Sequence, residues 1–162
     1  MNSVQVIQIF PGTERYAEAL RVRIDVLRRP LGLDGSSYDP AEEARLFHYI
    51  ALSESGVAGT VCLERIDQGT AKMRQVAVLD SMRGLGIGAA LVKLVEREAL
   101  AWGCRWIVAN ARETALGFYV KLGYESLPGV FLEVGIPHRR VRRCLVKEVG
   151  AETPEAAVDG GK

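Results

Sequence analysis

The sequence predicts an α/β fold: a single domain built on one mixed, mostly antiparallel sheet of six to seven strands, with helices on both faces. Three observations lead to this prediction. Short β-branched runs joined by glycine-containing turns fill residues 47–78. An apolar run at 76–78, a glycine-rich turn and a long amphipathic helix follow, and a second apolar run at 104–109 comes directly after the helix. Hairpins that lead into a strand–helix–strand unit indicate a mixed sheet.

Length and composition limit the functions open to the chain. Its 162 residues suggest one domain, placed here at 1–149, and the small, polar residues of 150–162 predict a disordered tail. A net charge of +1 argues against nucleic acid as a main partner. No run approaches 18 apolar residues, and no basic-then-apolar stretch opens the chain, so we expect neither a membrane span nor a secretion signal. The three cysteines are widely spaced, which indicates free thiols in a reducing cytoplasm and no metal site.

The N-terminal elements are a strand and two helices. Residues 4–10 alternate apolar and polar side chains and predict a first strand. Thr13 is placed to cap a helix that runs to about Leu27, and Pro30 ends it. Asp39, followed by a proline, predicts the start of a short helix that reaches Arg45.

Three strands and a long helix form the middle of the chain. The strands are predicted at 47–53, 57–67 and 71–78, and their short glycine-containing connections indicate antiparallel hairpins. The helix then presents apolar side chains at helical spacing between Ile87 and Trp102.

The C-terminal part alternates short elements. The apolar run 104–109 predicts a buried strand parallel to the one before the long helix. A short helix at 114–122 follows, then brief extended pieces at 124–127 and 131–134 and a final strand at 139–149. We interpret the basic run at 138–143 as a solvated face of this strand.

The glycine-rich turn between the strand and the long helix is predicted to bind an anion. A helix N-terminus presents unpaired N–H groups and about half a positive charge. Glycine at positions 84, 86 and 88 lets the backbone approach a phosphate, and Arg83 adds a donor for its oxygens. A turn that merely packs a helix on a strand needs fewer glycines. We therefore expect this segment to hold a pyrophosphate or a similar group.

Two coenzyme classes use such a turn. The dinucleotide fingerprint requires a glycine at the strand end and an acidic residue about 20 positions on, and the chain has neither. The other frame is Arg83-x-x-Gly86-x-Gly88, which resembles the acyl-coenzyme A pyrophosphate loop of the GCN5-related N-acetyltransferase (GNAT) family. Residues 117–124, GFYVKLGY, are similar to a second signature of this family. The resemblance covers residues 4–147.

The resemblance implies a set of residues that bind acetyl-coenzyme A. Backbone groups of the strand 76–78 would pair with the pantetheine arm, and in this family that strand is bulged and splays from the next. The N–H groups of the turn, with Arg83, would bind the pyrophosphate. Arg112 stands where many members carry an asparagine, and it could itself contact a phosphate. The implied residues are Val76, Ala77, Val78, Arg83, Gly84, Leu85, Gly86, Ile87, Gly88, Ala89 and Arg112.

The resemblance also implies catalytic groups. Tyr119 occupies the position from which many members donate a proton to the departing sulfur, although it could also be a core residue. Glu64, Glu133 and His138 are candidates for the base that must deprotonate the amine. His48 is interpreted as structural.

The expected activity is transfer of an acetyl group from acetyl-coenzyme A to a primary amine, without a metal. The alternative is a non-catalytic module that binds acyl-coenzyme A as a sensor or scaffold. A small metabolite, an antibiotic, a peptide N-terminus and a lysine side chain all remain open as acceptors. Homodimers are common in the family, and nothing in the sequence decides whether this chain forms one.

Overall fold

The computed structural model describes residues 3–34 and 38–146. The predicted tail at 150–162 and the end of the predicted last strand lie outside the described residues. In chain order the elements are β1 (Gln5–Ile9), α1 (Glu14–Arg23), η1 (Ile24–Arg28), η2 (Arg29–Leu31), α2 (Pro40–Arg45), β2 (Phe47–Ser53), β3 (Gly56–Asp67), β4 (Thr70–Val78), η4 (Asp80–Met82), α3 (Ile87–Ala101), β5 (Trp106–Arg112), η5 (Glu113–Ala115), α4 (Leu116–Lys121), β6 (Glu125–Ser126), β7 (Phe131–Glu133) and β8 (Ile136–Cys144).

The strands form one mixed sheet in the order β1-β2-β3-β4-β5-β8-β6, with β7 paired to β8. Among the strand pairs of residues 3–34 and 38–146, only β4–β5 is parallel, because α3 carries the chain across the sheet between these two strands. The predicted α/β class and the predicted hairpins are confirmed. The sheet has eight strands where six to seven were expected, because the short β6 and β7 both pair with β8.

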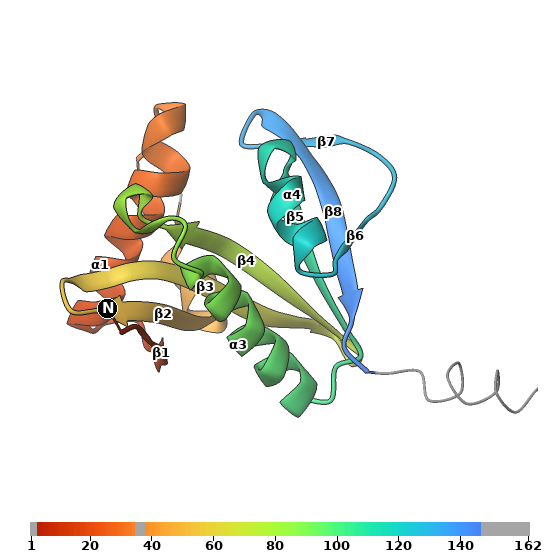
Figure 1. Ribbon diagram of the computed structural model, residues 1–162, viewed down its shortest axis with the longest axis horizontal. Helices are drawn as coiled ribbons and strands as arrows, with labels where there is room; N and C mark the ends of the chain where they lie inside the picture. The colour runs from red at the N-terminus through yellow and green to blue at the C-terminus, as the bar shows by residue number, and fades with distance from the viewer. Residues whose placement is uncertain (1–2, 35–37, 147–162) are drawn as a thin grey trace, which may run out of the picture.

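Helices cover both faces of the sheet, as expected (Figure 1). One core lies under α3 and α4 and contains Leu91, Val95 and Ile107, all fully buried. A smaller core lies under α1 and contains Val22 and Ile50. Over β5 and β8, the face opposite α3 and α4 has no covering helix in Figure 1. This leaves room for polar side chains on that part of the sheet.

The first helix differs from the prediction in its second half. Thr13 caps it as expected, accepting a hydrogen bond from the N–H of Tyr16. Regular α-helix ends at Arg23, and residues 24–28 form a π-helical turn. Mid-helix π turns are often found at functional sites because they re-aim the side chains that follow. Here the turn contains Arg28, which lines the cavity described below.

A buried ion pair fixes α1 to α2. The Arg23 guanidinium, 1% exposed, donates to both carboxylate oxygens of Glu43 at 2.7 and 2.8 Å. The Tyr16 hydroxyl donates to the same carboxylate, and His48 Nε2 lies 2.8 Å from the carbonyl oxygen of Glu43. His48 is therefore structural, as predicted, since it joins α2 to the sheet.

Strand β4 is bulged next to its partner β3. Thr60 pairs with Ala77 and Cys62 pairs with Arg74, so Val61 faces two residues of β4. Gln75 takes up the extra length with a φ of +60°, which is uncommon for a residue other than glycine. A bulge bends and twists its strand, and β4 leaves β5 directly before this point.

The C-terminal strands have other bounds than the sequence indicated, and β8 already ends at Cys144, before the predicted end at 149. The strand predicted at 104–109 is β5, which continues through Arg112, because its register with β8 holds as far as Arg112 opposite His138. For the same reason β8 begins at Ile136, before the predicted start at 139. Arginines of the basic run pair with carboxylates, among them Arg142 with Glu125. In the described part of the chain, no helix is long and apolar enough to cross a membrane.

Candidate functional site

The glycine-rich turn has the geometry of an anion site. Gly84 and Gly86 have φ values of +80° and +79°, a region that side chains with a Cβ rarely adopt. The N–H groups of residues 84–89 have no acceptor within the described ranges, and the first paired amide of α3 is that of Ala90. Arg83 is 64% exposed, and its Nε lies 3.3 Å from Asp80 Oδ1. Free amides and an exposed cation are therefore presented together at the N-terminus of α3.

Gly88 has a different role from the other two glycines. A Cβ built at this position would lie 3.1 Å from two ring atoms of Phe118. Gly88 therefore allows α4 to pack against the first turn of α3. The two sequence motifs, 83–88 and 117–124, meet in space through this contact.

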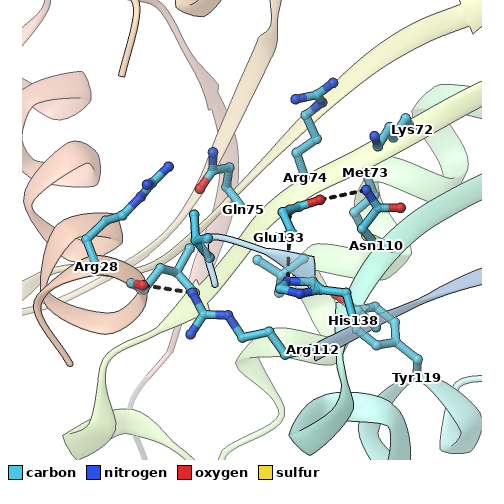
Figure 2. Close-up of a pocket in the computed structure, with 14 residues that line it drawn as sticks. Arg28, Lys72, Met73, Arg74, Gln75, Asn110, Arg112, Tyr119, Glu133 and His138 are labelled. Carbon is cyan, nitrogen blue, oxygen red and sulfur yellow. Dashed lines mark hydrogen bonds and ion pairs between the residues drawn. The ribbon is translucent and has the colours of Figure 1, made fainter. Parts of the chain in front are cut away.

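A cavity opens where β4 and β5 separate. The two strands pair only between residues 70–73 and 106–109, and beyond these residues the edge of β4 facing β5 has no strand partner in the part of the chain that the structure describes. The cavity has a volume of about 210 Å³. Its walls come from η1, β4, β5, α4 and the β7–β8 hairpin (Figure 2). The lining residues most used below are Arg28, Lys72, Arg112, Tyr119, Glu133 and His138.

Tyr119 lies in the wall formed by α4 and is only 6% exposed. Its ring packs edge-on against Phe118 and Tyr124, with centroids 5.0 and 5.6 Å away. Its hydroxyl has no hydrogen-bond partner among the residues that the structure describes. Burial raises the pKa of Tyr119 to about 12, so the hydroxyl keeps its proton at neutral pH and can act only as a donor toward an anion.

Glu133 and His138 lie diagonally across the β7–β8 hairpin, where Glu133 pairs with Ile136 and His138 pairs with Phe131. Glu133 Oε2 lies 3.9 Å from His138 Nε2, and Asn110 Nδ2 donates to Glu133 Oε1 at 2.9 Å. His138 is 3% exposed, and its Nδ1 lies 2.9 Å from the carbonyl oxygen of Ile136. In the neutral tautomer that donates through Nδ1, the free lone pair of Nε2 is on the side of Glu133. An amine nitrogen placed between these two atoms could donate one N–H to each of them.

Positive charge dominates the cavity wall. Arg112, predicted as a phosphate ligand, extends along the cavity, and its Nη2 donates to the carbonyl oxygen of Leu27 at 2.7 Å. Burial, followed by the nearby charge of Arg28, lowers the pKa of Arg112. Burial also lowers the pKa of Lys72, with further contributions from Arg74 and from the arginine at position 140.

The remaining predicted residues divide into two groups. Val76 lines the cavity, whereas the side chains of Ala77 and Ile87 are buried in the cores, so only their backbone groups could meet a ligand. Glu64 does not line the cavity, and its Oε2 lies 2.5 Å from Arg74 Nε.

Sequence reasoning did not single out Lys72, Arg74 or Gln75 as lining residues. The spacing of Lys72 and Arg74 on a strand places them on one face, and this could have indicated a charged wall. The position of Gln75 depends on the bulge, for which the sequence carries no local signal. Within the described ranges, no group of histidine, cysteine or acidic residues could hold a metal ion.

Comparisons with known proteins agree with this geometry. The model of the acetyltransferase (GNAT) family matches residues 16–124. YjcF of Bacillus subtilis (strain 168), an uncharacterized N-acetyltransferase, is 35% identical over 80 residues, which are 49% of this chain and 57% of the relative. The chain thus spans less than two thirds of the length of the first curated relatives it matches.

Solved structures show the same fold at low identity. A Lactobacillus plantarum protein superimposes with a TM-score of 0.78 and 21% identity over 89% of this chain and 99% of its own. An aminoglycoside 6'-N-acetyltransferase solved with coenzyme A gives a TM-score of 0.72 and 18% identity over 89% of this chain and 98% of its own.

Proposed function

Because the chain belongs to the acetyltransferase (GNAT) family, we propose that it transfers an acetyl group from acetyl-coenzyme A to a primary amine by direct attack of the amine on the thioester. The separation of β4 from β5 beside the glycine turn is the observation that carries this proposal. It provides a cavity and an unpaired strand edge on β4, the strand that leads along the chain to the glycine turn and the N-terminus of α3.

The described residues fit acetyl-coenzyme A as the co-substrate. The free amides of residues 84–89, with Arg83, would bind its pyrophosphate. The unpaired edge of β4 at Val76 and Val78 would bind the pantetheine amides as an added strand does. The thioester would then enter the cavity between Tyr119 and His138.

Attack requires a neutral amine. An alkylammonium has a pKa of about 10.4, so removing its proton at pH 7 corresponds to about 4–5 kcal/mol. His138 accepts this proton through Nε2, whose lone pair is available when Nδ1 donates to the carbonyl oxygen of Ile136. Glu133, 3.9 Å away and held by Asn110, would stabilise the imidazolium that forms.

Tyr119 acts on the leaving group. The pKa of its hydroxyl, about 12, is well above the value of about 8.5 for a thiol, so complete proton transfer to the sulfur is uphill. A hydrogen bond from the hydroxyl to the sulfur, formed as negative charge develops there, is the larger part of its contribution. The expected catalytic effect is therefore toward the low end of the range for general acids.

The test combines binding and turnover. Titration calorimetry with acetyl-coenzyme A reports on the glycine turn, and release of free thiol with a panel of amines reports on transfer. The proposal expects both signals, and it expects His138→Gln to lower kcat with little change in coenzyme affinity. Binding without thiol release for any amine would instead support a non-catalytic acyl-coenzyme A sensor. Absence of binding at millimolar acetyl-coenzyme A would contradict both.

A further inference from the structure

The cavity wall is more cationic than acetyl transfer requires. Four of its side chains are basic, namely Arg28, Lys72, Arg74 and Arg112, and one, Glu133, is acidic. Of the four basic groups, Arg74 has a carboxylate partner, Glu64. The other three have no ion pair with any residue that the structure describes. Glu133 and Glu64 offset this positive charge only in part, and like charges gathered in a half-buried cavity cost free energy, which a bound anion would reduce.

Arg28 and Arg112 are both held in place beside η1, although Arg28 belongs to η1 and Arg112 to β5. Arg112 Nη2 is fixed by the carbonyl oxygen of Leu27, 85 residues away along the chain. Arg28 Nε donates to the Tyr38 hydroxyl at 3.1 Å. Each guanidinium has five N–H donors and uses one group in its anchor, so both keep donors free for a ligand.

The position of Arg28 is supported by a chain of further contacts. Its guanidinium carbon lies 4.5 Å from the centre of the Tyr38 ring, and that of the buried Arg23 lies 4.2 Å from the same centre. The Tyr38 hydroxyl donates to Gln75 Oε1 at 3.3 Å. Gln75 is the bulged residue of β4, so the bulge that separates β4 from β5 also helps to position Tyr38 and Arg28.

The two arginines and Tyr119 lie at different ends of the cavity. In Figure 2, Arg28 and the Arg112 guanidinium lie on one side, Tyr119 lies on the other, and Glu133 and His138 lie between them. An amine placed at Glu133 and His138 would have the two guanidiniums on the side away from Tyr119.

We propose, resting on the acetyltransferase function above, that the acceptor is a small amine that also carries a carboxylate or phosphate, and that Arg28 and Arg112 bind this anionic group. The cavity volume of about 210 Å³ is below the roughly 300–1,000 Å³ typical of drug-sized ligands, which favours an acceptor of amino-acid size. The same charges repel polycationic acceptors such as polyamines, aminoglycosides and lysine-rich peptides.

The experiment compares matched amines that differ in their anionic group. The pairs are 4-aminobutyrate with butylamine, L-alanine with ethylamine, and O-phosphoethanolamine with ethanolamine, with spermidine as the polycation. Thiol release from acetyl-coenzyme A is measured for each. In at least one pair, the amine that carries the carboxylate or phosphate should have a kcat/KM about 10- to 100-fold higher than its partner without this group. The two carboxylate pairs and the phosphate pair distinguish the two anions.

Variants of Arg28 and Arg112 show whether these two side chains bind the anionic group. Arg28→Gln and Arg112→Gln should each raise KM for the amine that carries the anionic group about 10-fold or more, and should reduce the difference in kcat/KM between the two members of its pair. Arg97→Gln, an exposed arginine of α3 outside the cavity, is the matched control and should change neither value. Melting temperatures of all three variants show whether they are folded.

Acetyl-coenzyme A affinity, measured by calorimetry in the same proteins, distinguishes failure of the acceptor proposal from failure of the acetyltransferase function. If acetyl-coenzyme A binds and neutral amines or spermidine react as well as the anionic ones, the acceptor proposal is overturned and the acetyltransferase function stands. If no anionic amine reacts or binds to the complex with coenzyme A, the acceptor proposal is also overturned. If Arg112→Gln weakens acetyl-coenzyme A binding and leaves KM for the amine unchanged, Arg112 serves the coenzyme, which refutes its assigned role. Loss of acetyl-coenzyme A binding by the wild type would refute the function itself.

Discussion

Replacing Glu43 by glutamine tests whether the buried ion pair fixes α1 and α2 in place. The Glu43 carboxylate accepts hydrogen bonds from both terminal nitrogens of Arg23 and from the Tyr16 hydroxyl. Burial alone would raise the pKa of Glu43, but its hydrogen bonds with Arg23 lower it below the ordinary value, which shows that the ionised form is favoured in the folded protein. Glutamine would present an amide N–H₂ to one of the donors of Arg23 and leave its charge uncompensated.

The expected loss is large, because Arg23 is almost completely buried. Removing one member of a buried ion pair costs about 3–5 kcal/mol. A domain of this size is stable by about 5–15 kcal/mol, so the variant loses a substantial part of its free energy of unfolding. The melting temperature should fall by about 6–20 °C, taking about 2–4 °C per kcal/mol.

Urea denaturation of the wild type, Glu43→Gln and Glu42→Gln measures this effect. Glu42 is the adjacent residue of α2, is exposed, and lies 4.0 Å from Arg45, so its replacement should cost less than about 0.5 kcal/mol. The double variant Arg23→Met with Glu43→Leu should lose less than Glu43→Gln, because no charge is left buried without a partner. If Glu43→Gln and Glu42→Gln lose the same amount, the ion pair does not carry the stability assigned to it.

Three further predictions concern the turn, the leaving group and the buried histidine. Gly86→Ala places a residue with a Cβ at a φ of +79°, which costs about 1–2 kcal/mol; if the free turn relaxes, calorimetry should find acetyl-coenzyme A bound about 5- to 30-fold more weakly, and if it does not, the same cost lowers the free energy of unfolding, so a variant with unchanged affinity and unchanged stability would contradict the need for this φ. Tyr119→Phe should lower kcat about 10- to 100-fold with acetyl-coenzyme A affinity retained, and a wild-type kcat would remove Tyr119 from the mechanism. Burial lowers the pKa of His48 below its ordinary 6.5, so below about pH 6.5 the unfolded chain takes up a proton that the folded protein does not, and the free energy of unfolding should fall by up to about 1.4 kcal/mol per pH unit. His48→Asn should flatten this fall between pH 7 and 5.5 in urea titrations, and an equally steep fall in the variant would assign it to other groups.

The elements with strong local signals could be predicted from the sequence. Strand β2 has the predicted bounds, Phe47–Ser53, because both of its neighbouring turns are marked by polar residues or glycine. Helix α2 begins after Asp39, whose side chain accepts from the N–H of Ala41 as the Asp-Pro pair indicated. The backbone geometry of the glycine-rich turn could also be predicted, since glycine at 84 and 86 serves a local conformation.

The cavity to which we assign the acceptor could not be predicted in the same way, because contacts between residues distant in sequence form it. The anchor of Arg112 is the carbonyl of Leu27, and the partner of Glu133 is Asn110 on another strand. Gly88 shows the same limit within a motif, since its spacing suggested a phosphate contact and the structure places it against Phe118. Spacing reveals that a residue without a side chain is needed, but not which neighbour requires it.

The β7–β8 turn supports a functional role for Glu133. Val134, the next residue, has a φ of +46°, and β-branched side chains are rare in this left-handed region because the Cβ crowds the following carbonyl. Such a residue costs about 1–3 kcal/mol and persists only where the surrounding structure imposes it. Val134 and Gly135 form the tight connection after Glu133, which pairs with Ile136 on a strand of only three residues and whose carboxylate lies 3.9 Å from His138 Nε2. A longer, relaxed turn would let Glu133 move away into solvent, so the strain is consistent with selection for the position of this carboxylate.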